Sequence, residues 1–244
     1  MKRWYYDLHL HSCLSPCGDD DSTPNNIAGM ASLCELDIVA LTDHNTSKNC
    51  PAFFKAAQKY GIIPIAGMEL TTSEDVHIVC LFEKLEDAMK FDDYVQNHRF
   101  LIKNRPEIFG NQTVLDEEDR PIFEVTELLT SATHISVEDA VTVVNSFGGV
   151  CYPAHIDREA NGIIAVLGTI PPDSEFKIYE LRDSKNIDAY NQKYGIDKSR
   201  FIISSDAHRL TDMRDKESFF LLPDGDGTDE SVRKEIFKHL RGEV

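Results

Sequence analysis

Metal-ligating side chains recur at the ends of short apolar runs in this chain. The residues that follow or end such runs are Asp7, His9, His11, Asp43, His44, Glu69, His155, Asp206 and His208. Imidazole nitrogens and carboxylate oxygens are the usual protein ligands of Zn, Mn and Fe ions. A single histidine in such a place is most often satisfied by hydrogen bonds, but repetition at several run ends predicts a shared metal site.

The spacing within these motifs supports that prediction. On a strand, alternate side chains point to the same side, so the two imidazoles of His9-Leu10-His11 would face one ion. The same holds for Asp206-Ala207-His208. Each motif is weak evidence alone. Together with Thr42-Asp43-His44 at a third run end, they predict chemistry that depends on a metal.

The apolar runs alternate with amphipathic stretches, a pattern typical of an α/β fold. Strands are expected at residues 5–10, 37–42, 62–66, 77–82, 150–154, 176–181 and 201–204. Helices are expected after Thr23-Pro24, from Pro51 to Gly61, at residues 85–101, from Ser136 to Gly148, and from Thr228 to Leu240. The simplest arrangement is one parallel β/α barrel of about seven or eight units. The carboxyl ends of its strands would bring the polar residues to one mouth.

Residues 103–130 interrupt this pattern with a polar segment that contains Pro106, Pro121 and an acidic cluster at 116–119. We predict that residues 1–244 form a single barrel domain and that 103–130 is an insertion on its rim. The insertion would serve either as a lid or as a solvated loop.

The charge balance excludes some classes of function. The 244 residues include 25 Lys and Arg against 42 Asp and Glu, which gives a net charge of −17. Such a chain is unsuited to coat long nucleic acids or to dock on anionic membranes. No segment has the apolar length of a membrane span, and the N-terminus lacks the apolar region of a signal peptide. A cytoplasmic location is the resulting expectation.

At these motifs the sequence resembles the polymerase and histidinol phosphatase (PHP) family of metal-dependent phosphoesterases. The matching segments are Asp7-Leu8-His9-Leu10-His11, Leu41-Thr42-Asp43-His44, Gly67-Met68-Glu69, Pro153-Ala154-His155 and Ser205-Asp206-Ala207-His208. The resemblance implies a single distorted (β/α)7 TIM-like barrel with two or three divalent ions at its mouth. Zn, Mn and Fe all suit the ligand types.

The resemblance also implies how the ligands divide among three ions. The first ion would be held by His9, His11, Glu69 and Asp206. Glu69 would bridge to a second ion, which His77 and His155 complete. A third ion would be held by His44, His208 and a residue of the loop at 12–22. Asp19 is the best match for that last ligand, with Asp20 and Cys17 as alternatives, because this loop is longer than the family pattern.

The implied function is hydrolysis of a phosphate ester by a metal-activated water. Glu69, Asp206, His208 and Asp43 are the predicted catalytic residues, with Asp43 orienting a ligand imidazole. Arg158 would bind the substrate phosphate, or else be a surface arginine paired with Asp157 or Glu159.

The predicted substrate is a small phosphomonoester, a nucleotide or a short oligonucleotide, since bound ions would make the mouth locally positive on an acidic molecule. Two alternatives stay open. One is a non-catalytic metal-binding PHP module. The other is an amidohydrolase-type enzyme acting on C–N bonds, which the absence of a strand-end lysine disfavours.

Overall fold

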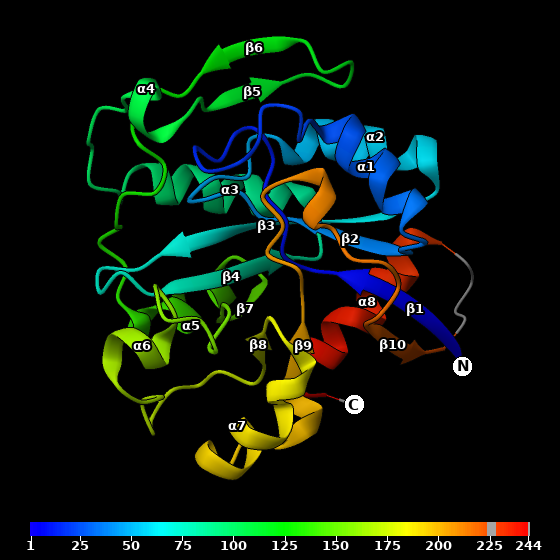
Figure 1. Cartoon of the computed structure of the whole chain (residues 1–244), viewed down its shortest axis with the longest axis vertical. Coiled ribbons are helices and arrows are strands. Elements are labelled where there is room, and N and C mark those ends of the chain that lie inside the picture. Colours follow the sequence, from blue (N-terminus) through cyan, green and yellow to red (C-terminus); the bar gives the residue numbers. More distant parts are fainter. Residues whose placement is uncertain (224–227, 244) are drawn as a thin grey trace.

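The computed structural model describes residues 1–223 and 228–243, and its main element is a curled six-stranded sheet (Figure 1). The strands follow the order β10-β1-β2-β3-β4-β7. Their bounds are β1 (Lys2–Asp7), β2 (Ile38–Leu41), β3 (Ile63–Thr71), β4 (His77–Phe82), β7 (Gly149–Pro153) and β10 (Phe219–Leu222). A separate parallel pair is formed by β8 (Tyr179–Leu181) and β9 (Phe201–Ile203).

Helices cover both faces of the sheet. They are α1 (Pro24–Leu33), α2 (Cys50–Tyr60), α3 (Leu85–Gln96), α5 (Val137–Ser146), α6 (Ile163–Leu167), α7 (Ile187–Tyr194) and α8 (Asp229–Leu240). Val39 and Leu41 of β2 belong to the apolar core shared with α1, α2, α3 and α5. Ile38 and Ala40 belong to the core on the other face, which includes α8. This split follows from the alternation of side chains along a strand.

Several helix ends lie where the sequence places them. The Thr23 side chain accepts a hydrogen bond from the Asn26 amide at the start of α1, and Thr228 does the same for Ser231 at the start of α8. Gly61 ends α2 with a φ of 70°, which glycine adopts at little cost. None of the helices in the described ranges is long and apolar enough to cross a membrane.

The direction of β4 corrects the predicted parallel barrel. β1, β2 and β3 are parallel to one another, but β4 is antiparallel to both β3 and β7. The α/β class and the curled sheet agree with the prediction; an all-parallel arrangement is wrong, and the count of seven units stays a prediction. The reversal has a consequence for the site. Thr71 at the end of β3 pairs with His77, so the first residue of β4 lies at the mouth.

The predicted insertion forms the short helix α4 (Pro106–Phe109) and a hairpin of β5 (Thr113–Leu115) and β6 (Pro121–Glu124), at the top of Figure 1. It packs on the loop that follows β1. The Thr113 amide donates to the Cys13 carbonyl at 3.3 Å, and Val114 is buried against Leu14 and Leu129. Its role as a lid, and the single-domain boundaries, stay predictions.

Candidate metal centre

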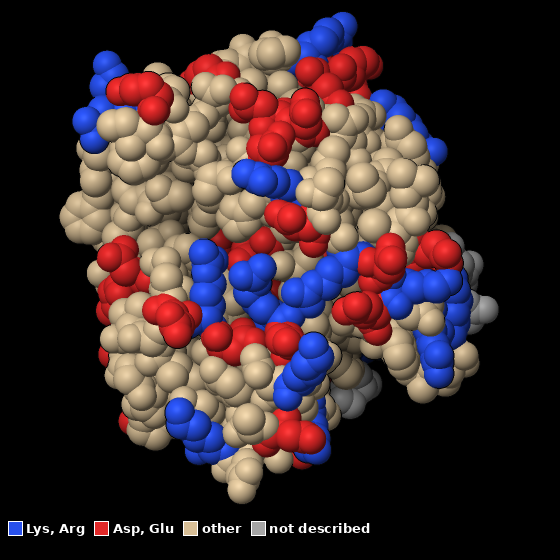
Figure 2. Space-filling model, in the orientation of Figure 1, with Lys and Arg blue, Asp and Glu red and all other residues tan. Residues whose placement is uncertain are grey.

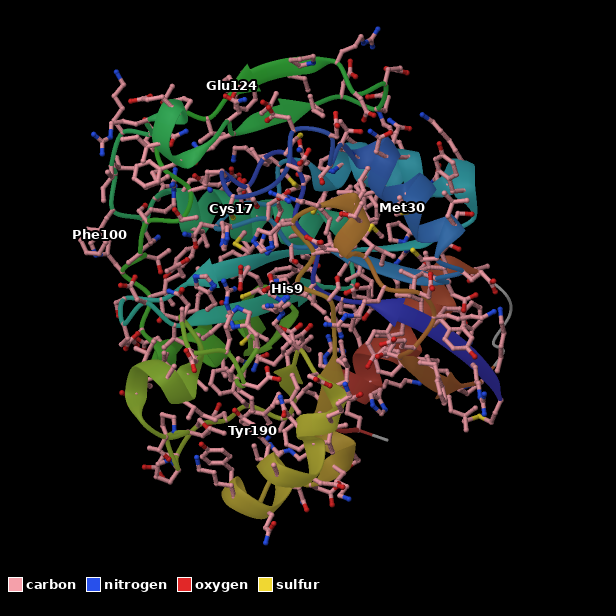
Figure 3. All side chains as sticks on the ribbon, in the orientation of Figure 1. His9, Cys17, Met30, Phe100, Glu124 and Tyr190 are labelled. Carbon is pink, nitrogen blue, oxygen red and sulfur yellow. The ribbon has the colours of Figure 1, made fainter. Side chains whose placement is uncertain are left out.

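Glu69, in β3, lies at the centre of a buried group of imidazoles. Its side chain is 1% exposed, and its two oxygens lie 2.9–3.4 Å from ring nitrogens of several histidines. These are His9, His11, His44, His77 and His155. The label of His9 in Figure 3 marks this region, near the ribbons of β3 and β4. Residues separated by more than 140 positions in the sequence therefore share one site.

Asp206 supplies a second carboxylate beside His9 and His11. Its Oδ1 lies 3.6 Å from Nε2 of His9 and 3.4 Å from Nε2 of His11. The two Nε2 atoms of His9 and His11 face each other at 3.2 Å, as the His-x-His spacing predicts. The ring of His208 stacks on that of His11, with ring centroids 4.2 Å apart. These four residues and Glu69 form the part of the site nearest to β1.

The backbone holds these side chains in place. A parallel β-bridge joins Leu10 to Ala207, so the His-x-His and Asp-x-His motifs that contain them lie side by side. Another bridge joins His44 to Glu69. His155 and Asp206 have φ values of 31° and 54°. Non-glycine residues seldom adopt such conformations, and they occur most often at functional sites.

Hydrogen bonds to Nδ1 fix the orientation of two imidazoles of the cluster. Nδ1 of His9 lies 2.8 Å from the Glu180 carboxylate, and Nδ1 of His208 lies 2.8 Å from the Asp206 carbonyl. Since both partners can only accept, each Nδ1 must donate. Protein groups that bond one ring nitrogen in this way leave the other for a metal. In both histidines that other atom is Nε2.

Asp43 orients His11 through a serine. The hydroxyl of Ser15 donates to Asp43 Oδ1 at 2.7 Å and lies 3.0 Å from Nδ1 of His11. The amide and hydroxyl of Ser12 also donate to Asp43, both at 2.7 Å. Asp43 is therefore hydrogen-bonded to the loop after β1 and is linked to the His11 imidazole through Ser15.

Burial and neighbouring charges shift the pKa values of four cluster histidines, two upward and two downward. Burial lowers the pKa of His9 and His11, but the carboxylates around them outweigh this effect. The pKa of His9 is raised well above its usual value, and that of His11 is raised to about 9. Burial lowers the pKa of His44 well below its usual value and that of His208 to about 4. Because metal ligands must be deprotonated, ion binding at His9 and His11 has to release protons.

Several buried polar atoms of the cluster lack hydrogen bonds although they lie close together. Nδ1 of His44 is 3.0 Å and Nδ1 of His77 is 2.9 Å from a Glu69 oxygen, and neither makes a hydrogen bond. Asp206 Oδ1 is also buried without a hydrogen-bond partner. Unbonded buried polar atoms are costly. Divalent ions bound among these nitrogen and oxygen atoms would satisfy them.

Three overlapping groups in the described ranges have ligand atoms close enough to share an ion, with all atoms within 4.8 Å of one another. They are His9, His11, Glu69 and Asp206; His44, Glu69 and His77; and His11, His44 and His208. The first group has the composition that the sequence analysis gives to the first ion. The second has His44 in addition to Glu69 and His77, while His155 lies beside it, with Nε2 3.0 Å from Glu69 Oε1. All these assignments of ligands to ions stay predictions.

The structure does not bring Asp19 to this cluster. Its carboxylate is 42% exposed and lies 4.0 Å from Nε of Arg209. Asp20 accepts from the side chain of Asn111 instead. The third group has His11 in the place expected for Asp19. Cys17, labelled in Figure 3, is exposed and belongs to none of the three ligand groups in the described ranges.

Arginines border the cluster at Asp206. Nη1 of Arg158 lies 3.1 Å and Nε of Arg182 lies 3.9 Å from Asp206 Oδ2. Arg158 thus lies at the edge of the site and is paired with Asp206 rather than with Asp157 or Glu159, while its role in binding phosphate stays a prediction. Sequence reasoning missed two residues of this region, Glu180 in β8 and Arg182 directly after it, because this strand carries no recognisable motif. The only sequence signal for Glu180 is a carboxylate inside the apolar run of residues 176–181.

The PHP domain model matches residues 7–159. This span contains the ligand motifs from Asp7 to His155 and covers more than half of the chain. The chain therefore belongs to the PHP domain family.

Individual proteins are similar to the chain in sequence or in structure. The chain is 36% identical over 77 residues to an error-prone DNA polymerase of Symbiobacterium thermophilum, which covers 32% of the chain and 7% of the polymerase. A lesion-specific endonuclease of Pyrococcus furiosus has a similar structure, with a TM-score of 0.66 and 18% identity over 100% of this chain and 57% of that one. A protein of Bifidobacterium adolescentis, provisionally described as a metal-dependent phosphoesterase, has a TM-score of 0.55 and 15% identity over 96% of both chains. The chain thus spans only part of the polymerase and the endonuclease, and the two structures share its fold.

Proposed function

We propose that this protein is a metal-dependent phosphoesterase, which hydrolyses a phosphate ester at the Glu69 cluster. The observation that carries the proposal is the set of three overlapping ligand groups with arginines at their edge. Because the groups share His11, His44 and Glu69, they describe neighbouring ions rather than separate sites. Ions bound there would activate water and offset negative charge on a phosphoryl group.

The chain's own residues would contribute binding and orientation. The Arg158 side chain is 38% exposed beside the buried Asp206, so its guanidinium can reach both the site and solvent. A planar guanidinium can bind two oxygens of one phosphate at once. Its place beside the ligand groups would hold a phosphate against them. Arg158 is therefore the proposed phosphate-binding residue.

His208 is the cluster imidazole that solvent reaches most easily. Its side chain is 24% exposed, whereas those of the histidines around Glu69 are at most 10% exposed. Burial and the neighbouring His11 lower its pKa to about 4, so the ring is neutral at pH 7. A neutral imidazole at the mouth can serve as a ligand or accept a proton. Glu69, Asp206 and His208 are thus the residues proposed to act at the reacting phosphate, with Asp43 positioning His11.

The two arginines beside Asp206 favour phosphate over a C–N substrate. Within the described ranges, the basic side chains within 4.0 Å of the Glu69 and Asp206 carboxylates are histidines and arginines, with no lysine. Amidohydrolase-type sites typically add a strand-end lysine or a later pair of histidines, and the lack of such a lysine here disfavours that alternative. The other alternative, a non-catalytic metal-binding module, would bind metal but hydrolyse no ester.

The test is turnover by protein stripped of metal and then reloaded with Mn or Zn. We expect hydrolysis of p-nitrophenyl phosphate, of its diester analogue, or of both, and loss of that activity with a chelator. Glu69→Gln should lower the rate at least 100-fold. Glu117→Gln is the control, since Glu117 is an exposed residue of the insertion, paired with Lys55. Metal binding without turnover of any ester would favour the non-catalytic module, and equal rates in Glu69→Gln and the wild type would overturn the proposal.

A further inference from the structure

A pocket with basic residues in its wall opens beside the cluster. Its volume is about 610 Å³, within the range of about 300–1,000 Å³ typical of sites for small ligands. The basic pocket, as we name it, contains the cations Arg158, Arg182, Lys185 and Arg214. Lys and Arg side chains gather across the middle of the face in Figure 2, in the part of the view where Figure 3 labels His9. This concentration stands out on a chain with a net charge of −17.

Two arginines of the basic pocket connect it to the metal centre. Arg158 and Arg182 both approach Asp206 Oδ2, at 3.1 Å and 3.9 Å. Nη1 of Arg214 donates to the carbonyl of Arg182 at 2.6 Å, which holds the third arginine on the same wall. A phosphate bound beside Asp206 would therefore adjoin the pocket, whose other two cations are Lys185 and Arg214.

The carboxylates of the pocket do not neutralise its outer cations. Asp157 accepts hydrogen bonds from the amides of Arg182 and Asp183, and Asp183 accepts from the amide of Lys185. Their charges thus fix the backbone of the loop after β8. In the described ranges neither Lys185 nor Arg214 forms an ion pair, although Glu217 also lines the pocket. Cations kept together without ion-pair partners favour an anionic ligand.

We infer that the substrate carries a second phosphate group, which Arg182, Lys185 and Arg214 bind while the first lies at the metal centre. The inference rests on the proposed function. Guanidinium groups bind phosphate oxygens in pairs, and an ammonium adds a point charge. Arg158 already serves the first phosphate, so the other three cations are left for a second. That phosphate belongs either to a small bisphosphate or to the next nucleotide of a short strand.

Binding to the metal-free protein tests the pocket without relying on activity. Calorimetry should give at least tenfold tighter binding of methylenebisphosphonate than of methylphosphonate. The Lys185→Ala/Arg214→Ala variant should lose this preference. The Lys55→Ala/Lys90→Ala variant should keep it, because it also removes two positive charges but from exposed sites outside the pocket. Equal binding of the two phosphonates, or a preference that survives in Lys185→Ala/Arg214→Ala, would overturn the inference.

Activity then identifies the source of the second phosphate. A nucleoside monophosphate, the matching nucleoside bisphosphate and a 5′-phosphorylated dinucleotide would be compared by kcat/KM on the metal-loaded protein. A preference of tenfold or more for the bisphosphate alone indicates a small substrate, and one that includes the dinucleotide indicates a strand. If p-nitrophenyl phosphate is hydrolysed but the monophosphate matches both larger substrates, the inference fails while the proposed function stands. If no ester is hydrolysed, the proposed function fails.

Discussion

Glu180 offers a sharp test of how the site is held together, because it belongs to none of the ligand groups among the described residues and contacts His9 and His155 instead. One oxygen of this fully buried carboxylate lies 2.8 Å from Nδ1 of His9 and accepts from the His155 amide at 2.9 Å. Glu180→Ala removes both contacts and leaves two buried donors without an acceptor. Glu180→Gln can place its amide oxygen at the same point, so it keeps both hydrogen bonds and loses the charge.

The expected losses follow from these contacts. Removing a partner that orients a metal-binding imidazole costs about 10–100-fold in metal affinity. We expect Glu180→Ala to fall in this range and Glu180→Gln to lie between it and the wild type. Each unsatisfied donor costs about 1–3 kcal/mol, so Glu180→Ala should also lower the free energy of unfolding by about 2–6 kcal/mol. The assays are competition of Zn against a chromophoric chelator and urea unfolding, with Glu117→Ala as the control. A folded Glu180→Ala protein that binds Zn within twofold of the wild type would refute the positioning role.

Other changes test different parts of the structure. The pKa of His11 is about 9 in the metal-free protein, and its ring must lose a proton to bind metal. The apparent affinity for Mn should therefore rise about tenfold per pH unit for each proton released, up to about pH 9; calorimetry at several pH values that gives a flat profile would contradict this. Gly67→Ala would place a methyl group 2.5 Å from the Cys80 carbonyl oxygen between β3 and β4. It should lower the free energy of unfolding by about 2 kcal/mol, and an unchanged urea midpoint would count against that packing. Asp19→Ala should leave the number of bound ions unchanged, because its carboxylate is exposed and near Arg209; loss of one ion, measured by elemental analysis, would restore Asp19 as a ligand.

Much of the site can be read from the sequence because its residues fall in short motifs at strand ends. The His-x-His spacing predicts the facing imidazoles of His9 and His11, and the apolar run before His155 predicts its place at the mouth. His77 is different, since only the antiparallel direction of β4 explains why a residue at the start of a strand reaches the site. Strand direction depends on tertiary pairing, which local patterns do not encode.

The residues that sequence reasoning missed act through long-range contacts. Glu180 meets His9 across 171 positions, and nothing near it in the sequence indicates that partner. The position of Asp19 also depends on a long-range contact, because its amide donates to the His208 carbonyl at 2.9 Å. That hydrogen bond holds the Asp19 backbone beside His208, while its carboxylate is 42% exposed and lies near Arg209.

The central claim is that divalent ions held around Glu69 hydrolyse a phosphate ester, and its most direct test measures bound metal and rate on the same samples. Metal-free protein would be loaded stepwise with Mn, the bound ions counted by elemental analysis, and p-nitrophenyl phosphate and its diester assayed at each step. We predict that hydrolysis of at least one ester rises with bound metal to a plateau at two or three ions per chain, and that Glu69→Gln binds fewer ions and stays inactive. Hydrolysis at the full rate before any ion is bound, or none at full occupancy, would contradict the claim.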